Sequence, residues 1–217
     1  MDLLDCTLQP LHEDGELILY RAVHASPADG ITSSVLVVGP AAEYVSAATL
    51  ARLEHEYALA AELDRRWAVR PVGLDRYRGR AVLVLEDPGG EPLVRLLGTP
   101  MEVDAFLRLA VSISRTIGSL HAAGLIHKDI KPANVLVEAA TGDIWLTGFG
   151  IASRLRRGRQ SPDPPEFIAG TLAYMAPEQT GRMNRSVDSR SDLYSLGITL
   201  YQMLTGTLPF TASDPME

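Results

Sequence analysis

The order of hydrophobic and polar positions divides the chain into a strand-rich first part and a mainly helical second part. Short runs of β-branched and aliphatic residues, bounded by Gly, Pro or Asp, predict strands of an antiparallel sheet at residues 17–20, 34–38 and 80–85. Apolar residues recur at helical spacing over residues 46–63, where Ser46 is the expected N-cap. The first part is therefore expected to contain strands, one helix and further strands.

The second part carries two longer helical patterns. Residues 103–123 form an amphipathic pattern that Gly124 ends, because glycine readily takes the left-handed conformation that follows a helix. Residues 191–205 predict a buried helix that starts at Ser191 or Asp192 and is again followed by a glycine. This part is expected to be built mainly from helices.

A turn-rich stretch at residues 87–92, DPGGEP, links the two parts. The expected domains are therefore residues 1–87 and residues 88–217. Short strands are expected within residues 125–145, and the polar, Pro-rich residues 154–166 are expected to form a loop.

Composition narrows the possible partners and compartments. The chain has 217 residues, of which 46% are hydrophobic, so it is long enough to bury a substantial core. Its net charge of -7 argues against a nucleic-acid or anionic-membrane partner, because either would need a concentrated excess of Lys and Arg. The apolar runs are too short to span a bilayer, and the acidic start MDLLDC does not resemble a signal peptide. We therefore expect a cytoplasmic protein, in which the single Cys6 forms no internal disulfide.

Four sequence landmarks follow one another in the second part. They are HKDIKPAN at residues 127–134, GFG at residues 148–150, GTLAYMAPE at residues 170–178 and SDLYSLG at residues 191–197. Their order and spacing resemble the catalytic loop, metal-binding segment, activation segment and buried central helix of protein kinases. Over residues 8–210 the resemblance implies an α+β, two-lobed kinase fold. It also implies that the helical lobe is truncated after its central helix.

Particular residues refine this resemblance. Lys131 and Thr171 are typical of the Ser/Thr branch of the family. Residues 178–185, EQTGRMNR, are most similar to kinase-like N-terminal domains of large bacterial signalling proteins with several domains. The resemblance therefore implies a module cut from a longer signalling chain. Its expected partner is a protein or the neighbouring domains, with neither nucleic acid nor membrane.

The resemblance assigns roles to three residues of the catalytic loop. Asp129 stands where the substrate hydroxyl proton is accepted, Lys131 where the transferred phosphate is steadied, and Asn134 where one Mg²⁺ ligand lies. An alternative is that these residues persist because they pack and hydrogen-bond the loop.

The nucleotide-binding half of this machinery is incomplete in the sequence. His12, Asp14 and Leu17 occupy positions where glycines would let backbone N–H groups approach the phosphates. Val37 is placed where a Lys would contact the α- and β-phosphates. Glu56 matches the usual partner of that Lys and, without a cation, is expected to be solvated or locally paired.

The metal and adenine positions are also changed. Gly148 replaces an Asp that would bind Mg²⁺. Leu85 and Glu86 are expected to lie beside the adenine. Together with Glu56, they are expected to be the remnants of an ATP site. Pro88 falls where a backbone N–H would contact the base, and proline has none.

Two hypotheses follow. The first is a pseudokinase, a regulatory binding module of kinase shape for which no cofactor is expected. The second is an active Ser/Thr kinase that uses ATP and Mg²⁺ in an atypical site, with Asn134 as the remaining metal ligand. A third, a fragment without independent function, is the weakest.

Overall fold

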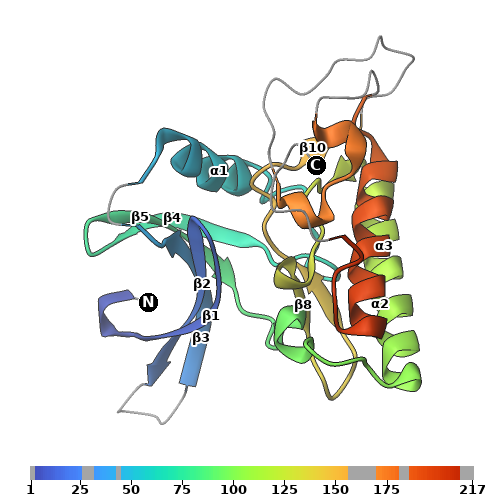
Figure 1. Ribbon diagram of the computed structural model, residues 1–217. Helices are drawn as coiled ribbons and strands as arrows, with labels where there is room; N and C mark the ends of the chain where they lie inside the picture. The colour runs from blue at the N-terminus through green and yellow to red at the C-terminus, as the bar shows by residue number, and fades with distance from the viewer. Residues whose placement is uncertain (1–2, 26–31, 43–44, 156–169, 181–185, 211–217) are drawn as a thin grey trace.

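The computed structural model describes residues 3–25, 32–42, 45–155, 170–180 and 186–210. A five-stranded antiparallel sheet forms one lobe, and the helices α2 and α3 lie side by side in the other (Figure 1). The strands run in the order β1-β2-β3-β5-β4. Their bounds are β1 Thr7–Asp14, β2 Leu17–Ala25, β3 Thr32–Pro40, β4 Pro71–Tyr77 and β5 Arg80–Glu86.

A tight hairpin joins β1 to β2. Asp14 pairs with Leu17, which leaves a two-residue turn in which Gly15 has a φ of 57°. That left-handed conformation suits glycine, which explains why Gly15 stands at this turn. A register shift between Pro10 and His12 bends β1 on its way to this turn.

The helix α1, Ala47–Ala58, packs beside β4 and β5. Its start confirms the prediction, because the Ser46 side chain accepts a hydrogen bond from the Thr49 backbone N–H. It ends before residue 63, and the following leucines, Leu59 and Leu63, turn into the core of the helical lobe.

The helical lobe is built around α2, Val103–Ala122, and α3, Ser189–Thr205. The N-cap of α3 is Asp188, whose side chain accepts from the Arg190 N–H, so the predicted start at Ser191 or Asp192 was wrong. Both of those residues lie within the first turns and are buried. Gly206 follows α3 with a φ of 76°, as the C-cap pattern predicts. No helix in the described residues is long and apolar enough to cross a membrane.

Short elements make up most of the remaining described structure and include the landmarks found in the sequence. Their bounds are β6 Glu91–Pro92, β7 Leu125–Ile126, β8 Val135–Val137, β9 Ile144–Leu146, β10 Ser153–Arg154, and the 3-10 turns η1 Leu3–Asp5, η2 Leu93–Leu96, η3 Pro132–Asn134, η4 Leu172–Tyr174 and η5 Pro177–Thr180. β6, β8 and β9 form a small sheet, and β7 pairs with β10. Most of the predicted loop at residues 154–166 lies outside the described residues.

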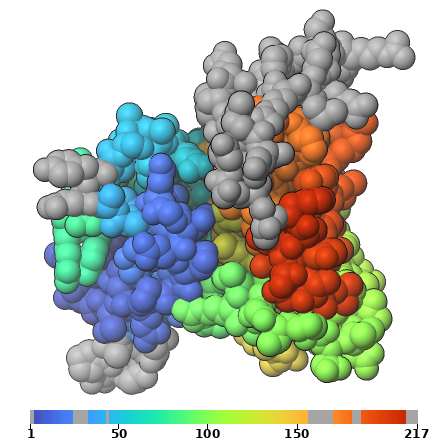
Figure 2. Space-filling view, viewed as in Figure 1, coloured from blue at the N-terminus to red at the C-terminus, as the bar shows by residue number. Residues whose placement is uncertain are grey.

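Buried apolar residues form a core in the helical lobe and a core on each face of the five-stranded sheet. The inner face shares its core with the helical lobe, because Leu36 of β3 and Leu136 of β8 belong to one cluster. The outer face packs Val37 and Val82 against Leu3 near the N-terminus. Between the lobes, Figure 2 shows this side of the molecule hollowed between the blue residues of the sheet and the red residues of α3.

Candidate active site

A buried carboxylate of α3 holds the loop between β7 and β8 in place by hydrogen bonds. Asp192 accepts hydrogen bonds from the backbone N–H groups of His127 at 2.9 Å and Lys128 at 2.8 Å. The His121 ring of α2 lies 2.8 Å from the same carboxylate. Three donors satisfy this buried group, so Asp192 ties α3 to the loop.

Two aromatic rings, those of Phe149 and Trp67, pack on the His127 side of the loop. The ring centroids of His127 and Phe149 are 4.7 Å apart, and Trp67 meets Phe149 edge-on at 6.3 Å. Burial lowers the pKa of His127, so the ring is neutral near pH 7 and donates from Nε2 to the Thr147 carbonyl at 2.9 Å. The contact between the His127 and Phe149 rings is therefore part of the scaffold that holds the loop.

Asp129, Lys131 and Asn134, predicted from the sequence as one group, lie together in the structure. Asn134 Nδ2 donates to the Asp129 carbonyl at 2.8 Å and to its Oδ2 at 3.0 Å, and Lys131 Nζ lies 3.0 Å from the same Oδ2. The backbone N–H of Thr171 donates to Asp129 Oδ1 at 2.9 Å. Burial opposes the charge of Asp129, but the charge of Lys131 and these hydrogen bonds outweigh it and lower the pKa of Asp129. Asp129 is therefore an ionised, fully hydrogen-bonded carboxylate.

Lys131 is also engaged from the other lobe. Its ammonium group donates to the Asp14 carboxylate at the β1–β2 turn and to the Thr171 hydroxyl. His12 lies near this contact, and burial lowers its pKa although Asp14 partly opposes the effect. The turn that was expected to face phosphates therefore meets the catalytic loop directly.

Glu56 of α1 is buried, which contradicts the expectation of a solvated or locally paired carboxylate. Only 4% of the residue is exposed, and its Oε1 has no hydrogen-bond partner among the described residues. Burial raises the pKa of Glu56 to about 7, partly opposed by the backbone N–H groups of Phe149 and Gly148. Near neutral pH this carboxyl is therefore shared between its protonated and ionised forms.

The family model for the protein kinase domain matches residues 42–217. The chain belongs to the protein kinase family. Serine/threonine-protein kinase PknB of Mycobacterium tuberculosis is 34% identical over 169 residues, which cover 77% of this chain and 26% of that protein. Pkn1 of Myxococcus xanthus is 36% identical over 140 residues, or 63% of this chain and 20% of that protein. AfsK of Streptomyces griseus is 42% identical over 130 residues, or 60% and 15%. The matches thus span about a quarter or less of these relatives' lengths.

Kinases of this family hold Mg²⁺ with an Asp where this chain has Gly148. Gly148 has a φ of 79°, and a Cβ built there would lie 2.8 Å from Asn134 Cγ. The Asn134 amide fills this space and bonds to Asp129 instead. No group of three His, Cys, Asp or Glu side chains in the described parts of the chain is placed to hold a metal ion. The residues present at this position therefore do not fit the metal site of a kinase.

The position of the kinase lysine on β3 requires a correction. Val37, the residue aligned with it from the sequence, packs on the outer face of the sheet with Leu3 and Val82, so that placement was wrong. Its neighbour Val38 packs on the inner face, in the cluster that also contains Leu53 of α1. The pleat of the strand alternates side chains between the two faces, so Val38 is the residue that faces α1 and the other lobe. Neither valine can contact a phosphate as a cation.

Leucines fill the inner face where kinases place adenine. Leu85, the predicted adenine neighbour, is fully buried in one cluster with Leu11 of β1, Leu36 of β3 and Leu136 of β8. Glu86 points outward to a double contact with Arg65. The roles of Leu85 and Glu86 in nucleotide binding stay predictions.

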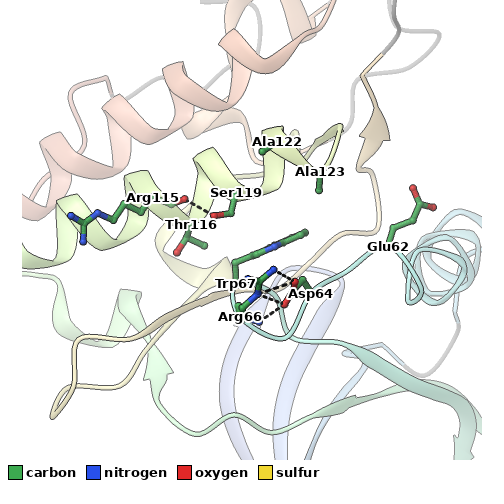
Figure 3. A pocket seen from close by; sticks show the side chains of 9 residues that line it. All are labelled: Glu62, Asp64, Arg66, Trp67, Arg115, Thr116, Ser119, Ala122 and Ala123. Carbon is green, nitrogen blue, oxygen red and sulfur yellow. Dashed lines mark hydrogen bonds and ion pairs between the residues drawn. The ribbon is translucent and has the colours of Figure 1, made fainter.

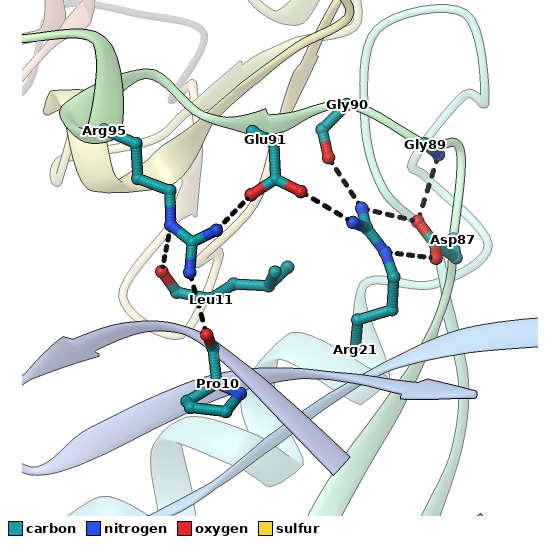
Figure 4. Close-up of polar contacts among 8 residues, drawn as sticks. All are labelled: Pro10, Leu11, Arg21, Asp87, Gly89, Gly90, Glu91 and Arg95. Carbon is teal, nitrogen blue, oxygen red and sulfur yellow. Dashed lines mark hydrogen bonds and ion pairs between the residues drawn. The ribbon is translucent and has the colours of Figure 1, made fainter. Parts of the chain in front are cut away.

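A polar network, which sequence analysis missed, joins the link between the lobes to β1 and β2 (Figure 4). Arg21 of β2 pairs with the buried Asp87 at 2.8 Å and with Glu91 at 2.8 Å. Arg95 pairs with Glu91 at 2.6 Å and donates to the Leu11 carbonyl at 2.9 Å. These residues hold β1 against the linker at residues 87–92. The only signal in the sequence was the high share of Arg and acidic residues.

A hollow away from this site lies between α2 and the segment after α1 (Figure 3). Its volume is about 580 Å³, and its lining includes Trp67, Thr116, Ser119 and the ion pair of Arg66 with Asp64. None of the catalytic-loop residues lines it.

Proposed function

We propose that this protein kinase domain is a pseudokinase that acts as a regulatory binding module for a protein partner or for neighbouring domains of a longer chain. The observation that carries the proposal is the metal position, where Gly148 offers no ligand atom and the Asn134 amide is bonded to Asp129. Phosphoryl transfer depends almost entirely on positioning and on electrostatic stabilisation of the phosphates. Without the metal carboxylate and the β3 cation, both contributions are lost.

The size of the expected loss supports this reading. Removing one preorganised electrostatic contact typically slows an enzyme about 10²–10³-fold, so two such losses give roughly 10⁴–10⁶-fold if they add. Kinases turn over about 1–100 times per second. A residual rate between about one event per two minutes and about one per twelve days would not serve signalling.

Ser/Thr kinase activity is the second candidate function. It is favoured by the mutual geometry of Asp129, Lys131 and Asn134, and by the names of the relatives, which are Ser/Thr protein kinases. In this case ATP and Mg²⁺ would bind in a rearranged site. The two candidates differ in whether the domain binds Mg-ATP at all.

A thermal-shift titration with Mg-ATP separates the candidates. Saturation at a hundred times Kd would stabilise the folded state by about 2.7 kcal/mol, and raise Tm by roughly 5–10 °C in a chain of this size. We expect no Mg-dependent shift. A clear shift, followed by phosphate transfer that Asp129→Asn abolishes and the exposed Asp143→Asn leaves unchanged, would overturn the pseudokinase proposal.

A further inference from the structure

We propose that the β1–β2 turn is a latch whose Asp14 carboxylate occupies the anion-binding position of Lys131 and holds the two lobes together. In kinases that position receives the phosphate, so Asp14 would act as an internal substitute for a phosphate group. The latch is a property of this chain's own residues, and it is independent of whether the domain transfers phosphate.

The contacts of Lys131 leave no donor for a second anion. An ammonium group has three N–H donors, and three oxygens lie within reach, one each from Asp14, Asp129 and Thr171. The Lys131 side chain is only 4% exposed. An external anion can therefore reach Lys131 only if one of these partners leaves.

Asp14 is the partner that can leave. Its side chain is 47% exposed, against 13% for Asp129, and it stands at the start of the β1–β2 turn. The turn residue Glu16 bonds to Ala41, Thr49 and Arg52, all within the lobe of the sheet, so these contacts do not hold the turn to the catalytic loop. Asp129 and Thr171, by contrast, are bonded to each other within the helical lobe. Opening the hairpin would break the Asp14 contact without disturbing the catalytic loop.

Asp14 also lies close to the segment that begins at residue 170, because Lys131 donates both to Asp14 and to the Thr171 hydroxyl. Burial raises the pKa of Tyr174 in η4, and the charge of Asp14 adds to this effect. The carboxylate thus lies between the sheet and the segment that follows residue 170. A competitor must carry anionic oxygens of the phosphate type, because Lys131 and the Thr171 hydroxyl are the groups it would meet.

The lysine content of the chain provides a residue-specific test. Lys128 and Lys131 are the only lysines in the sequence, so amine acetylation read by peptide mass spectrometry reports on both. Lys128 serves as the internal reference. We expect Asp14→Asn to raise the labelling rate of Lys131 relative to Lys128 about tenfold, because a charge-assisted hydrogen bond is lost. Glu13→Gln, the same charge change one residue earlier at an exposed site, should leave the ratio unchanged.

Hydrogen exchange provides the second readout. The amides around Gly15 should exchange faster in Asp14→Asn than in Glu13→Gln, and millimolar inorganic phosphate should protect Lys131 again only in the Asp14 variant. An unchanged Lys131 ratio in Asp14→Asn, or an equal rise in both variants, would overturn the latch. If Asp14→Asn does not fold, Asp14→Gly, which restores the residue usual in kinases, tests the same contact. The Mg-ATP titration of the unmodified chain tests the pseudokinase proposal separately, so a failure of the latch can be distinguished from a failure of that proposal.

Discussion

Glu56→Gln removes an ionisable group from the core while keeping its shape. Glu56 is buried in α1, and Val38, which packs on the inner face of the sheet in the cluster containing Leu53 of the same helix, brings no cation. Gln can still accept from the backbone N–H groups of Phe149 and Gly148, which contact the carboxyl. The substitution therefore isolates the energetic effect of the charge from the effect of packing.

The sign and size of the effect follow from the raised pKa. Glu56 has a pKa of about 7 in the fold against 4.5 for an unperturbed Glu, so the folded state binds the proton more tightly. Its stabilising contribution is present below pH 4.5 and is lost as the pH rises through about 7. At about 1.4 kcal/mol per pH unit, the full loss is about 3 kcal/mol. Because the group is buried, salt does not screen this term appreciably.

Chemical denaturation at several pH values measures the effect. Glu56→Gln should raise the free energy of unfolding relative to the unmodified chain, and this gain should be about 3 kcal/mol larger near pH 8 than near pH 4.5. The corresponding difference in Tm is roughly 6–12 °C. The exposed Glu54→Gln on the same helix should show no such pH-dependent difference. A constant difference between the two curves would refute an unpaired, buried carboxyl at this position.

Three further substitutions test the packing of the site. Gly148→Asp should destabilise the fold, as measured by urea unfolding, by about 1–2 kcal/mol because of its positive φ and further because of the contact with Asn134. Gly142 has a similar φ of 76° and open space around it, so Gly142→Asp should show only the first cost. Equal losses would exclude the contact with Asn134. Asp192→Ala should lower stability by about 3–5 kcal/mol, since it leaves three donors buried without their acceptor, and a loss below 1 kcal/mol by the same assay would contradict this. Ser46→Ala should cost about 1 kcal/mol in unfolding free energy through the lost N-cap of α1, and an unchanged value would show that the cap is not needed.

The landmarks of the helical lobe could be predicted because local signals and tertiary packing agree there. The pattern that ends at Gly206 and the group Asp129, Lys131 and Asn134 both appear where the sequence placed them. The N-cap of α3 could not be predicted as well, since Ser191, Asp192 and Asp188 are all good caps and only burial of the first two decides among them.

The edge strands of the sheet were harder to predict. β1 and β4 have mostly exposed side chains and contain Pro10, Pro71 and Gly73, so they lack the alternation and composition that indicate a strand. Neighbouring strands supply their hydrogen bonds, a signal that no local window contains. The one-residue error at Val37 has the same origin, because a run of aliphatic residues hides the pleat and only the packing partners reveal which face each residue takes.

The changes at the site are physically linked rather than independent. With Val38 in place of a cation, an ionised Asp at position 148 would put a second negative charge beside the buried Glu56, whose carboxyl already meets the Gly148 N–H. Glycine at this position avoids that repulsion, and protonation of Glu56 removes the remaining charge. On the opposite side, Lys131 is already paired with the ionised Asp129, and Asp14 takes the donor that a phosphate would meet in a kinase. The contacts that a nucleotide and metal would make in a kinase are thus either absent or made within the chain, and the Asp14 contact joins the two lobes without a ligand.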